Sequence, residues 1–369
     1  MTLTLDAPAH VGEAPPGPRP LDTPVVLEVK DLKTHFPLRE GLVRAVDGVS
    51  YKLHRGRTLG VVGESGCGKS VTAQSVLRIV PRPGKIVGGE ILLHRDGGSG
   101  GGGGGRETVD LTKLDPQGRE IRALRGNEIS YIYQEPMSAL SPVHTIGHVI
   151  TEVIRLHQKV NQEQARAIAI DTLTRVGLPR AEYVMSRYPH QLSGGMRQRA
   201  VIGIALACRP SILIADEPTT ALDVTTEAVV LDLLRSLQND FGMAIQIITH
   251  NLGVVAELAD EVVVMYLGRQ VEQAPVAELF ENPLHPYTRA LLRSMPRMTR
   301  GTRERLESIK GMVPDPFSVP KGCAYHTRCP HYEPGTCDDP QWREITPNHW
   351  VRCSRAEELV VTGLARPVN

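Results

Sequence analysis

Residues 57–80 read RTLGVVGESGCGKSVTAQSVLRIV, which places an apolar run, a glycine-rich turn and a helical pattern in direct succession. The turn, Gly63-Glu64-Ser65-Gly66-Cys67-Gly68-Lys69-Ser70, fits the pattern G-x-x-x-x-G-K-[ST]. A strand before this pattern and a helix after it are the context of a phosphate-binding loop, the P-loop. The glycines let backbone N–H groups turn onto phosphate oxygens, and the helix N-terminus adds partial positive charge. The alternative is a chance glycine turn, and the flanking strand and helix argue against it.

Side chains in and beyond this loop predict nucleotide chemistry. We expect Lys69 to reach the β- and γ-phosphates and the Ser70 hydroxyl to ligate Mg²⁺. We interpret Cys67 as a small filler of the loop rather than a redox group. Downstream, SILIADE is an apolar strand that ends in Asp216 and Glu217. Two acids after a strand are more often a solvated strand end, but beside a P-loop we expect Asp216 to hold Mg²⁺ through water. Glu217 then acts as general base on the attacking water, an effect worth about 10²–10⁴ in rate.

The composition is that of an ordinary globular chain. The 369 residues are 41% hydrophobic and 22% charged, with a formal net charge of +1. This balance gives no basic footprint for nucleic acid, and we predict none as a partner. No stretch approaches the ~20 apolar residues that span a bilayer. The first 24 residues lack the features of a secretory signal, so we expect a cytosolic chain.

The order of patterns along the chain predicts an α/β fold. Short β-rich runs alternate with helical stretches, which indicates a parallel sheet. We divide the chain into a disordered Pro-rich tail (1–24), an ATPase domain (25–281) with a helical subdomain at about 141–199, and an appended Pro-, Arg- and Cys-rich unit (282–369). The glycine tract at 97–105 is predicted to be a flexible hairpin loop, to which we assign no function.

A second motif narrows the class of P-loop protein. Leu192-Ser193-Gly194-Gly195-Met196-Arg197-Gln198 resembles the signature of ABC ATPases. The resemblance implies a RecA-like parallel sheet core with an antiparallel β subdomain and a helical signature subdomain. It also implies a head-to-tail dimer, in which Ser193, Gly194 and Gly195 of each subunit complete the P-loop site of the other.

The remaining elements of that family follow in order. Gln134 resembles the Q-loop glutamine that senses Mg²⁺ and water, and His250 resembles the switch histidine that contacts the γ-phosphate. Ala221-Leu222-Asp223 resembles the D-loop, which implies a place for Asp223 at the nucleotide. Thr220 stands where many relatives have serine, and we expect it to play no part in the chemistry.

The ring that stacks on adenine is harder to assign from the sequence. Phe36 is our candidate for this contact. His35 or Tyr51 are the alternatives, and Phe36 is otherwise a core residue.

Residues after the cassette indicate a subfamily. Asn282-Pro283-Leu284-His285-Pro286-Tyr287-Thr288-Arg289 resembles the run that follows the nucleotide domain in ATP-binding subunits of oligopeptide/dipeptide importers. The resemblance implies ATP hydrolysis coupled to peptide uptake, at the cytoplasmic face of the plasma membrane. The implied partners are two transmembrane permease subunits, a second ABC ATPase (a copy or a paralogue) and, indirectly, an extracytoplasmic solute-binding protein. The alternatives are an importer of nickel, glutathione or oligosaccharides, a soluble ABC ATPase, and a regulatory module with ATP as a switch.

Four of the six cysteines lie near the C-terminus, at Cys323, Cys329, Cys337 and Cys353. In a cytosolic chain such a cluster favours metal over disulfides. A similar tail in the importer family is associated with a [4Fe–4S] cluster, and four thiolates suit iron–sulfur or zinc. The spacing lacks the C-x₂-C pairs of zinc ribbons, so we predict iron–sulfur. Zinc and four reduced thiols are the alternatives.

Overall fold

Two β-sheets organise the part of the chain that the computed structural model describes, residues 23–96, 106–134, 140–220, 222–295 and 309–361. Several sequence predictions fall outside these ranges: nearly all of the N-terminal tail, the glycine tract, Ala221 and the residues just after Gln134. Among the described residues, no helix is both long enough and apolar enough to cross a membrane.

The larger sheet has eight strands in the order β11-β12-β10-β9-β3-β8-β7-β6. The five strands β9, β3, β8, β7 and β6 run parallel, as the alternation of strands and helices predicts. Every residue of β3, β7 and β8 is buried, which explains why these strands are continuous apolar runs in the sequence. The strands are β3 (Thr58–Val62), β6 (Ile129–Ile132), β7 (Ile212–Asp216), β8 (Ala244–Ile248), β9 (Glu261–Tyr266), β10 (Arg269–Pro275), β11 (Arg343–Thr346) and β12 (His349–Val351).

The smaller sheet is antiparallel, with strand order β2-β1-β4-β5. The long hairpin of β1 (Val25–Leu38) and β2 (Gly41–His54) forms one half, and β4 (Lys85–Asp96) with β5 (Arg106–Asp110) forms the other. Apolar residues such as Leu27, Val49 and Ile91 pack in one core with β3 and the helix that follows it. The short helices η1 (Leu111–Lys113) and α2 (Arg119–Leu124) lead from β5 to β6.

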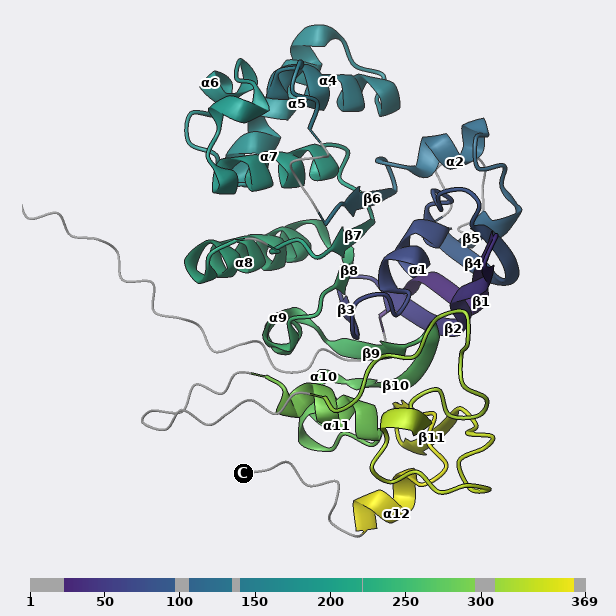
Figure 1. Cartoon of the computed structure of the whole chain (residues 1–369). Helices are drawn as coiled ribbons and strands as arrows, with labels where there is room; N and C mark the ends of the chain where they lie inside the picture. The colour runs from purple at the N-terminus through teal and green to yellow at the C-terminus, as the bar shows by residue number, and fades with distance from the viewer. Residues whose placement is uncertain (1–22, 97–105, 135–139, 221, 296–308, 362–369) are drawn as a thin grey trace, which may run out of the picture.

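A helical region lies between β6 and β7 in the sequence, and Figure 1 shows it gathered at one end of the molecule. Ile146, Ile150 and Ile154 recur at every fourth position of α4 and are fully buried among the neighbouring helices, as expected for an amphipathic helix. The elements are α4 (Ile146–His157), α5 (Gln162–Arg175), α6 (Ala181–Met185), η2 (Pro189–Gln191) and α7 (Gly194–Leu206).

The C-terminal segment, described at residues 282–295 and 309–361, joins the larger sheet at the end remote from the helical region (Figure 1). Its strand β12 pairs antiparallel with β10, so the segment extends the sheet of the ATPase core. Pro286 occupies the first turn of α11 (Pro286–Arg293), where its missing N–H is harmless. The other elements from α8 onward are α8 (Val224–Phe241), α9 (Leu252–Leu258), α10 (Val276–Glu281), η3 (His326–Arg328) and α12 (Ala356–Val361).

Candidate functional site

The predicted P-loop lies between β3 and α1 (Lys69–Val76), in the context that its sequence pattern requires. Gly63, Gly66 and Gly68 all have positive φ. A Cβ at Gly63 would lie 2.2 Å from the carbonyl oxygen of Met265, and one at Gly68 would lie 2.0 Å from that of Ala45. The loop therefore needs glycine at these two positions for close backbone approach as well as for conformation.

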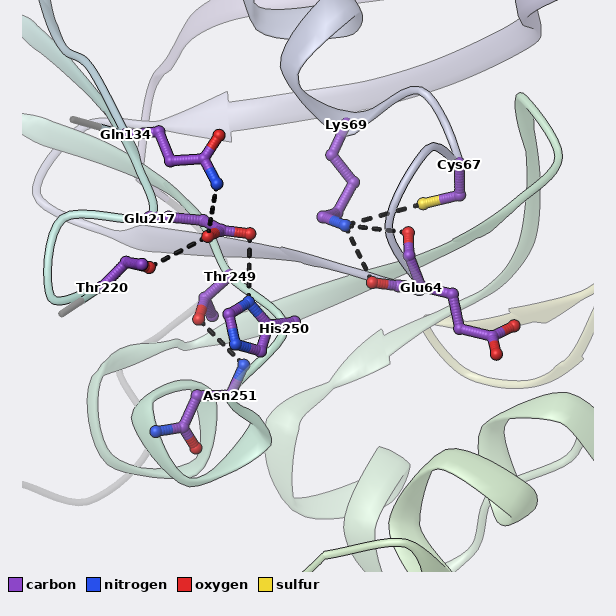
Figure 2. Close-up of polar contacts among 10 residues, drawn as sticks. Glu64, Cys67, Lys69, Gln134, Glu217, Thr220, Thr249, His250 and Asn251 are labelled. Carbon is purple, nitrogen blue, oxygen red and sulfur yellow. Dashed lines mark hydrogen bonds and ion pairs between the residues drawn. The ribbon is translucent and has the colours of Figure 1, made fainter. Parts of the chain in front are cut away.

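Lys69 is buried, and its ammonium group lies inside the loop (Figure 2). Nζ donates to the carbonyl oxygens of Gly63 (2.8 Å) and Glu64 (3.1 Å), and lies 3.8 Å from Sγ of Cys67. Burial raises the pKa of the Cys67 thiol although Lys69 lies beside it, so this cysteine is a neutral packing group. The contacts hold a positive charge where the β- and γ-phosphates of a nucleotide are expected.

Asp216 ends β7 and is almost fully buried. Its Oδ2 accepts a hydrogen bond from the Tyr131 hydroxyl at 2.7 Å, a partner that the sequence interpretation missed. Oδ1 is buried without a hydrogen-bond partner among the described residues. Burial raises the pKa of Asp216 despite the bond from Tyr131. A buried carboxylate oxygen with free acceptor capacity fits a hard cation such as Mg²⁺, which takes oxygen ligands.

Glu217 is the centre of a hydrogen-bonded group (Figure 2). Its Oε2 accepts bonds from Nε2 of Gln134 and Oγ1 of Thr220, both at 2.9 Å. Its Oε1 lies 3.0 Å from Nδ1 of His250. Burial raises the pKa of Glu217, but the bonds from His250 and Thr220 outweigh it and hold the pKa below its ordinary value. Glu217 is therefore ionised near neutral pH, as a general base must be.

Thr220 corrects one expectation from the sequence. We expected it to stand apart from the predicted chemistry, but its hydroxyl contacts the carboxylate of Glu217. The signal in the sequence is its spacing, because a turn after a strand brings residue i+3 back to residue i. Glu217 has φ of +48°, which is uncommon for a residue other than glycine. The backbone N–H of Thr220 also donates to the carbonyl oxygen of Glu217, at 3.1 Å, which closes the turn.

Sheet topology explains why residues so distant in sequence lie together. The strands β3, β8, β7 and β6 are consecutive neighbours in the sheet and run parallel. Their carboxyl ends therefore lie along one edge, where open α/β sheets bind ligands. The P-loop follows β3 and His250 follows β8. Asp216 ends β7 with Glu217 directly after it, and Gln134 follows β6.

A cleft of about 450 Å³ opens at this edge, a size in the range usual for ligand pockets. It is lined by residues from the P-loop, from the strand ends and from α11. They are Val62, Gly63, Glu64, Ser65, Gln134, Glu217, Thr220, His250, Leu252 and Leu291. The structure thus brings together the predicted P-loop, Q-loop and switch positions around one space.

Other predicted site residues lie elsewhere. The ring of Phe36 packs on Gly84, because a Cβ added to Gly84 would lie 2.5 Å from the Phe36 ring. Phe36 is not among the residues that line the cleft. Ser193 caps α7 and Asp223 caps α8 through bonds to the helices' own N–H groups. These two helix starts are neighbours, because a Cβ at Gly195 would lie 3.4 Å from the Thr226 methyl group.

The four C-terminal cysteines line a second cavity, together with three histidines (His285, His326 and His331) and other residues. Burial raises the pKa of the Cys323 thiol to about 11 and that of Cys353 to about 12, so both thiols are neutral at physiological pH. Among the described residues, no group of three or more His, Cys, Asp or Glu side chains is arranged to hold a metal ion. The iron–sulfur prediction therefore gains no support from this structure.

Comparison with known proteins identifies relatives along nearly the whole chain. Residues 46–220 match the family model of ABC transporters, and residues 271–337 match the C-terminal region of oligopeptide/dipeptide transporters. The probable peptide ABC transporter ATP-binding protein y4tR of Sinorhizobium fredii is 46% identical over 339 residues, covering 91% of this chain and 96% of that protein. The oligopeptide transport ATP-binding protein AppD of Bacillus subtilis is 48% identical over 306 residues, covering 83% and 88% respectively.

Solved structures share the architecture. The dimeric structure of MJ0796, a bacterial ABC transporter cassette, aligns with a TM-score of 0.57 at 24% identity, over 68% of this chain and 98% of that chain. The cbiO1 protein of Clostridium perfringens, part of the transporter complex cbiONQ, aligns with a TM-score of 0.55 at 26% identity, over 69% and 90%. These likenesses confirm the predicted cassette fold over about two thirds of the chain.

Proposed function

Because the chain belongs to the ABC transporter family, we propose that it is the ATP-hydrolysing motor subunit of an importer for peptides. One observation supports the chemistry above others: Gln134, Glu217 and His250 form a single hydrogen-bonded group beside the P-loop. The peptide class is supported by the C-terminal region that the chain shares with oligopeptide/dipeptide transporters and by the names of its relatives.

In this proposal the loop amides and Lys69 bind the β- and γ-phosphates of ATP. The hydroxyl of Ser70, the amide of Gln134 and the free oxygen of Asp216 are the groups that would hold Mg²⁺, whose charge offsets that of the phosphates. The carboxylate of Glu217 accepts the proton of the attacking water. His250 orients that carboxylate through its 3.0 Å contact and lines the cleft, where it would contact the γ-phosphate.

The second half of each site comes from another subunit. The start of α7 at Ser193, Gly194 and Gly195 suits an anion. None of these three residues is among those that line the cleft. We infer that they, with Asp223, complete the site of a second ATPase chain, either a copy or a paralogue. Two permease subunits bind this pair at the cytoplasmic face of the plasma membrane, and a solute-binding protein outside delivers the peptide.

The experiment that tests the motor role is an anaerobic, detergent-solubilised pull-down of the tagged full-length chain, with mass spectrometry of everything retained. We expect two polytopic membrane proteins and a second ABC ATPase or a second copy. Their genes would then identify the solute-binding protein whose peptide affinity can be measured. Recovery of soluble partners alone, with the chain absent from membranes, would overturn the importer proposal in favour of a soluble ABC ATPase.

The four-cysteine cavity takes no part in the proposed reaction. Four thiols match iron–sulfur or zinc in number and softness, but binding either would have to displace the protons of Cys323 and Cys353. Iron, sulfide and zinc analysis of anaerobically purified protein decides among three states. About four iron and four sulfide per chain would support the predicted cluster, stoichiometric zinc would favour the zinc site, and neither would mean reduced thiols.

A further inference from the structure

The P-loop residue Glu64 is held by the C-terminal segment. Its carboxylate forms a two-pronged ion pair with Arg328, in which Nη1 donates to Oε2 at 2.6 Å and Nη2 donates to Oε1 at 3.1 Å. The Arg328 side chain is only 3% exposed, and that of Glu64 is 25% exposed. In Figure 2 the Glu64 carboxylate points away from Lys69, out of the phosphate loop. The pair joins residues 264 positions apart in the sequence.

A second contact holds the main chain at the same position. The backbone N–H of Glu64 donates to the hydroxyl of Tyr287, at 2.8 Å. The Tyr287 ring is fully buried and packs against Tyr266 and Tyr325, with ring centroids 4.7 and 5.3 Å away. Arg328 also donates to the Tyr266 hydroxyl, at 3.3 Å. Both the side chain and the main chain of Glu64 are therefore fixed by one packed cluster.

Charge gives this arrangement a consequence for nucleotide binding. Glu64 lines the cleft in which the phosphates of ATP are expected. A carboxylate without a partner there would repel the phosphates, and the repulsion is strong where water is partly excluded. Arg328 neutralises the carboxylate and directs it away from the loop. A two-pronged arginine–carboxylate pair also fixes geometry, which a single point charge does not.

We propose that Arg328 and Tyr287 are positioning residues for the P-loop, which set its affinity for ATP from the C-terminal segment. The proposal rests on the P-loop role given above. Both residues are next to residues that line the cysteine cavity. Arg328 directly precedes Cys329, and the N–H of Tyr287 donates to Nδ1 of His285. Cys329 and His285 both line the cavity. A ligand that bound in the cavity and shifted either contact would therefore change ATP affinity, and ATP would change the affinity for that ligand by the same factor.

The test measures binding of a fluorescent ATP analogue with Mg²⁺, and steady-state ATPase, in full-length variants. Arg328→Met should weaken nucleotide binding roughly tenfold, within the range usual for coupling between two sites. The turnover rate at saturating ATP should change by less than about twofold, because the residue touches no reacting atom. Adding Glu64→Gln to Arg328→Met should restore most of the affinity, since it removes the carboxylate without a partner. A purely structural role of Arg328 predicts no such rescue.

Two controls separate the possible failures. Arg352→Met removes an arginine of the same segment that donates to the main-chain carbonyl of Gln270 and lies over the Trp342 ring, neither of which lines the cysteine cavity, and it should leave ATP affinity unchanged. Lys69→Ala should abolish binding. If Lys69→Ala binds ATP like the wild type, the P-loop role itself fails.

If Lys69→Ala behaves as expected but Arg328→Met binds like the wild type, only the positioning role fails. An equal loss in Arg328→Met with and without Glu64→Gln would also overturn it. Should Arg328→Met not fold, Tyr287→Phe removes a single hydroxyl and must still weaken binding. Unchanged affinity in a folded Tyr287→Phe protein would contradict the proposal.

Discussion

Replacing the proposed general base by its amide, Glu217→Gln, isolates the chemical step from binding. The side chain keeps its size, and its amide oxygen can still accept the bonds from Gln134 and Thr220, so the cluster should persist. What is lost is the proton acceptor, worth about 10²–10⁴ in rate. That range equals about 3–5 kcal/mol of activation free energy, at 1.36 kcal/mol for each factor of ten. ATP binding should hold or improve, because one negative charge leaves the cleft.

The assay combines phosphate release at saturating Mg²⁺-ATP with size-exclusion chromatography of the same samples. We expect a turnover rate of at most about one hundredth of the wild type, with accumulation of an ATP-bound dimer. Glu163→Gln, an exposed glutamate in the first turn of α5, is the matched control and should retain normal turnover. Turnover of Glu217→Gln above about a tenth of the wild type would remove Glu217 from the role of base.

Two further predictions use the P-loop glycines and one ion pair that joins β2 of the smaller sheet to β10 of the larger sheet. Gly68→Ala should abolish ATP binding in calorimetry, because its Cβ would overlap the Ala45 carbonyl. At Gly66 nothing lies within 4 Å of an added Cβ. Gly66→Ala therefore costs only about 1–2 kcal/mol for an alanine with positive φ, and the variant should still bind ATP. Equal ATP affinities of Gly68→Ala and Gly66→Ala would refute the steric explanation. Burial raises the pKa of Asp47, but the Arg269 guanidinium outweighs this effect and holds the pKa below its ordinary value. The ionised carboxylate therefore stabilises the folded state at any pH above the ordinary pKa, and this stabilisation is lost as the pH falls through the folded-state pKa. Arg269→Met should therefore move acid unfolding, followed by circular dichroism, to a higher pH, and an unmoved midpoint would exclude the ion pair as the cause.

The parts of the site that could be predicted from sequence are those in which local pattern carries the geometry. The P-loop is contiguous, and its strand, glycines and helix are all visible in 24 residues. Asp216 lies about 150 positions away, yet a strand that ends in acids predicts its place at the carboxyl edge of the sheet. The structure has β3 and β7 on either side of β8, which brings their ends to the same edge.

Contacts that depend on distant packing could not be predicted in this way. The bond from Tyr131 to Asp216 depends on how β6 and β7 align. The pair of Arg328 with Glu64 depends on how the C-terminal segment folds back over the core. The adenine contact is a further case, because Phe36 packs on Gly84 and is not among the residues that line the cleft, and its contact with adenine stays a prediction. Composition and spacing contain no information on these partners.

The strand pairing of β10 with β12 has a consequence for biosynthesis. Until β12 is made, the outer side of β10 is an open sheet edge, and such edges pair with other chains. The ribosome must first synthesise residues 276–348, which takes about 4–15 s at the usual ~5–20 residues per second. In the finished chain the edge strand at this end of the sheet is β11. It is four residues long and carries Arg343 and Glu344, two features that discourage further pairing. The nascent chain is therefore most prone to aggregate in the seconds before its C-terminal segment emerges.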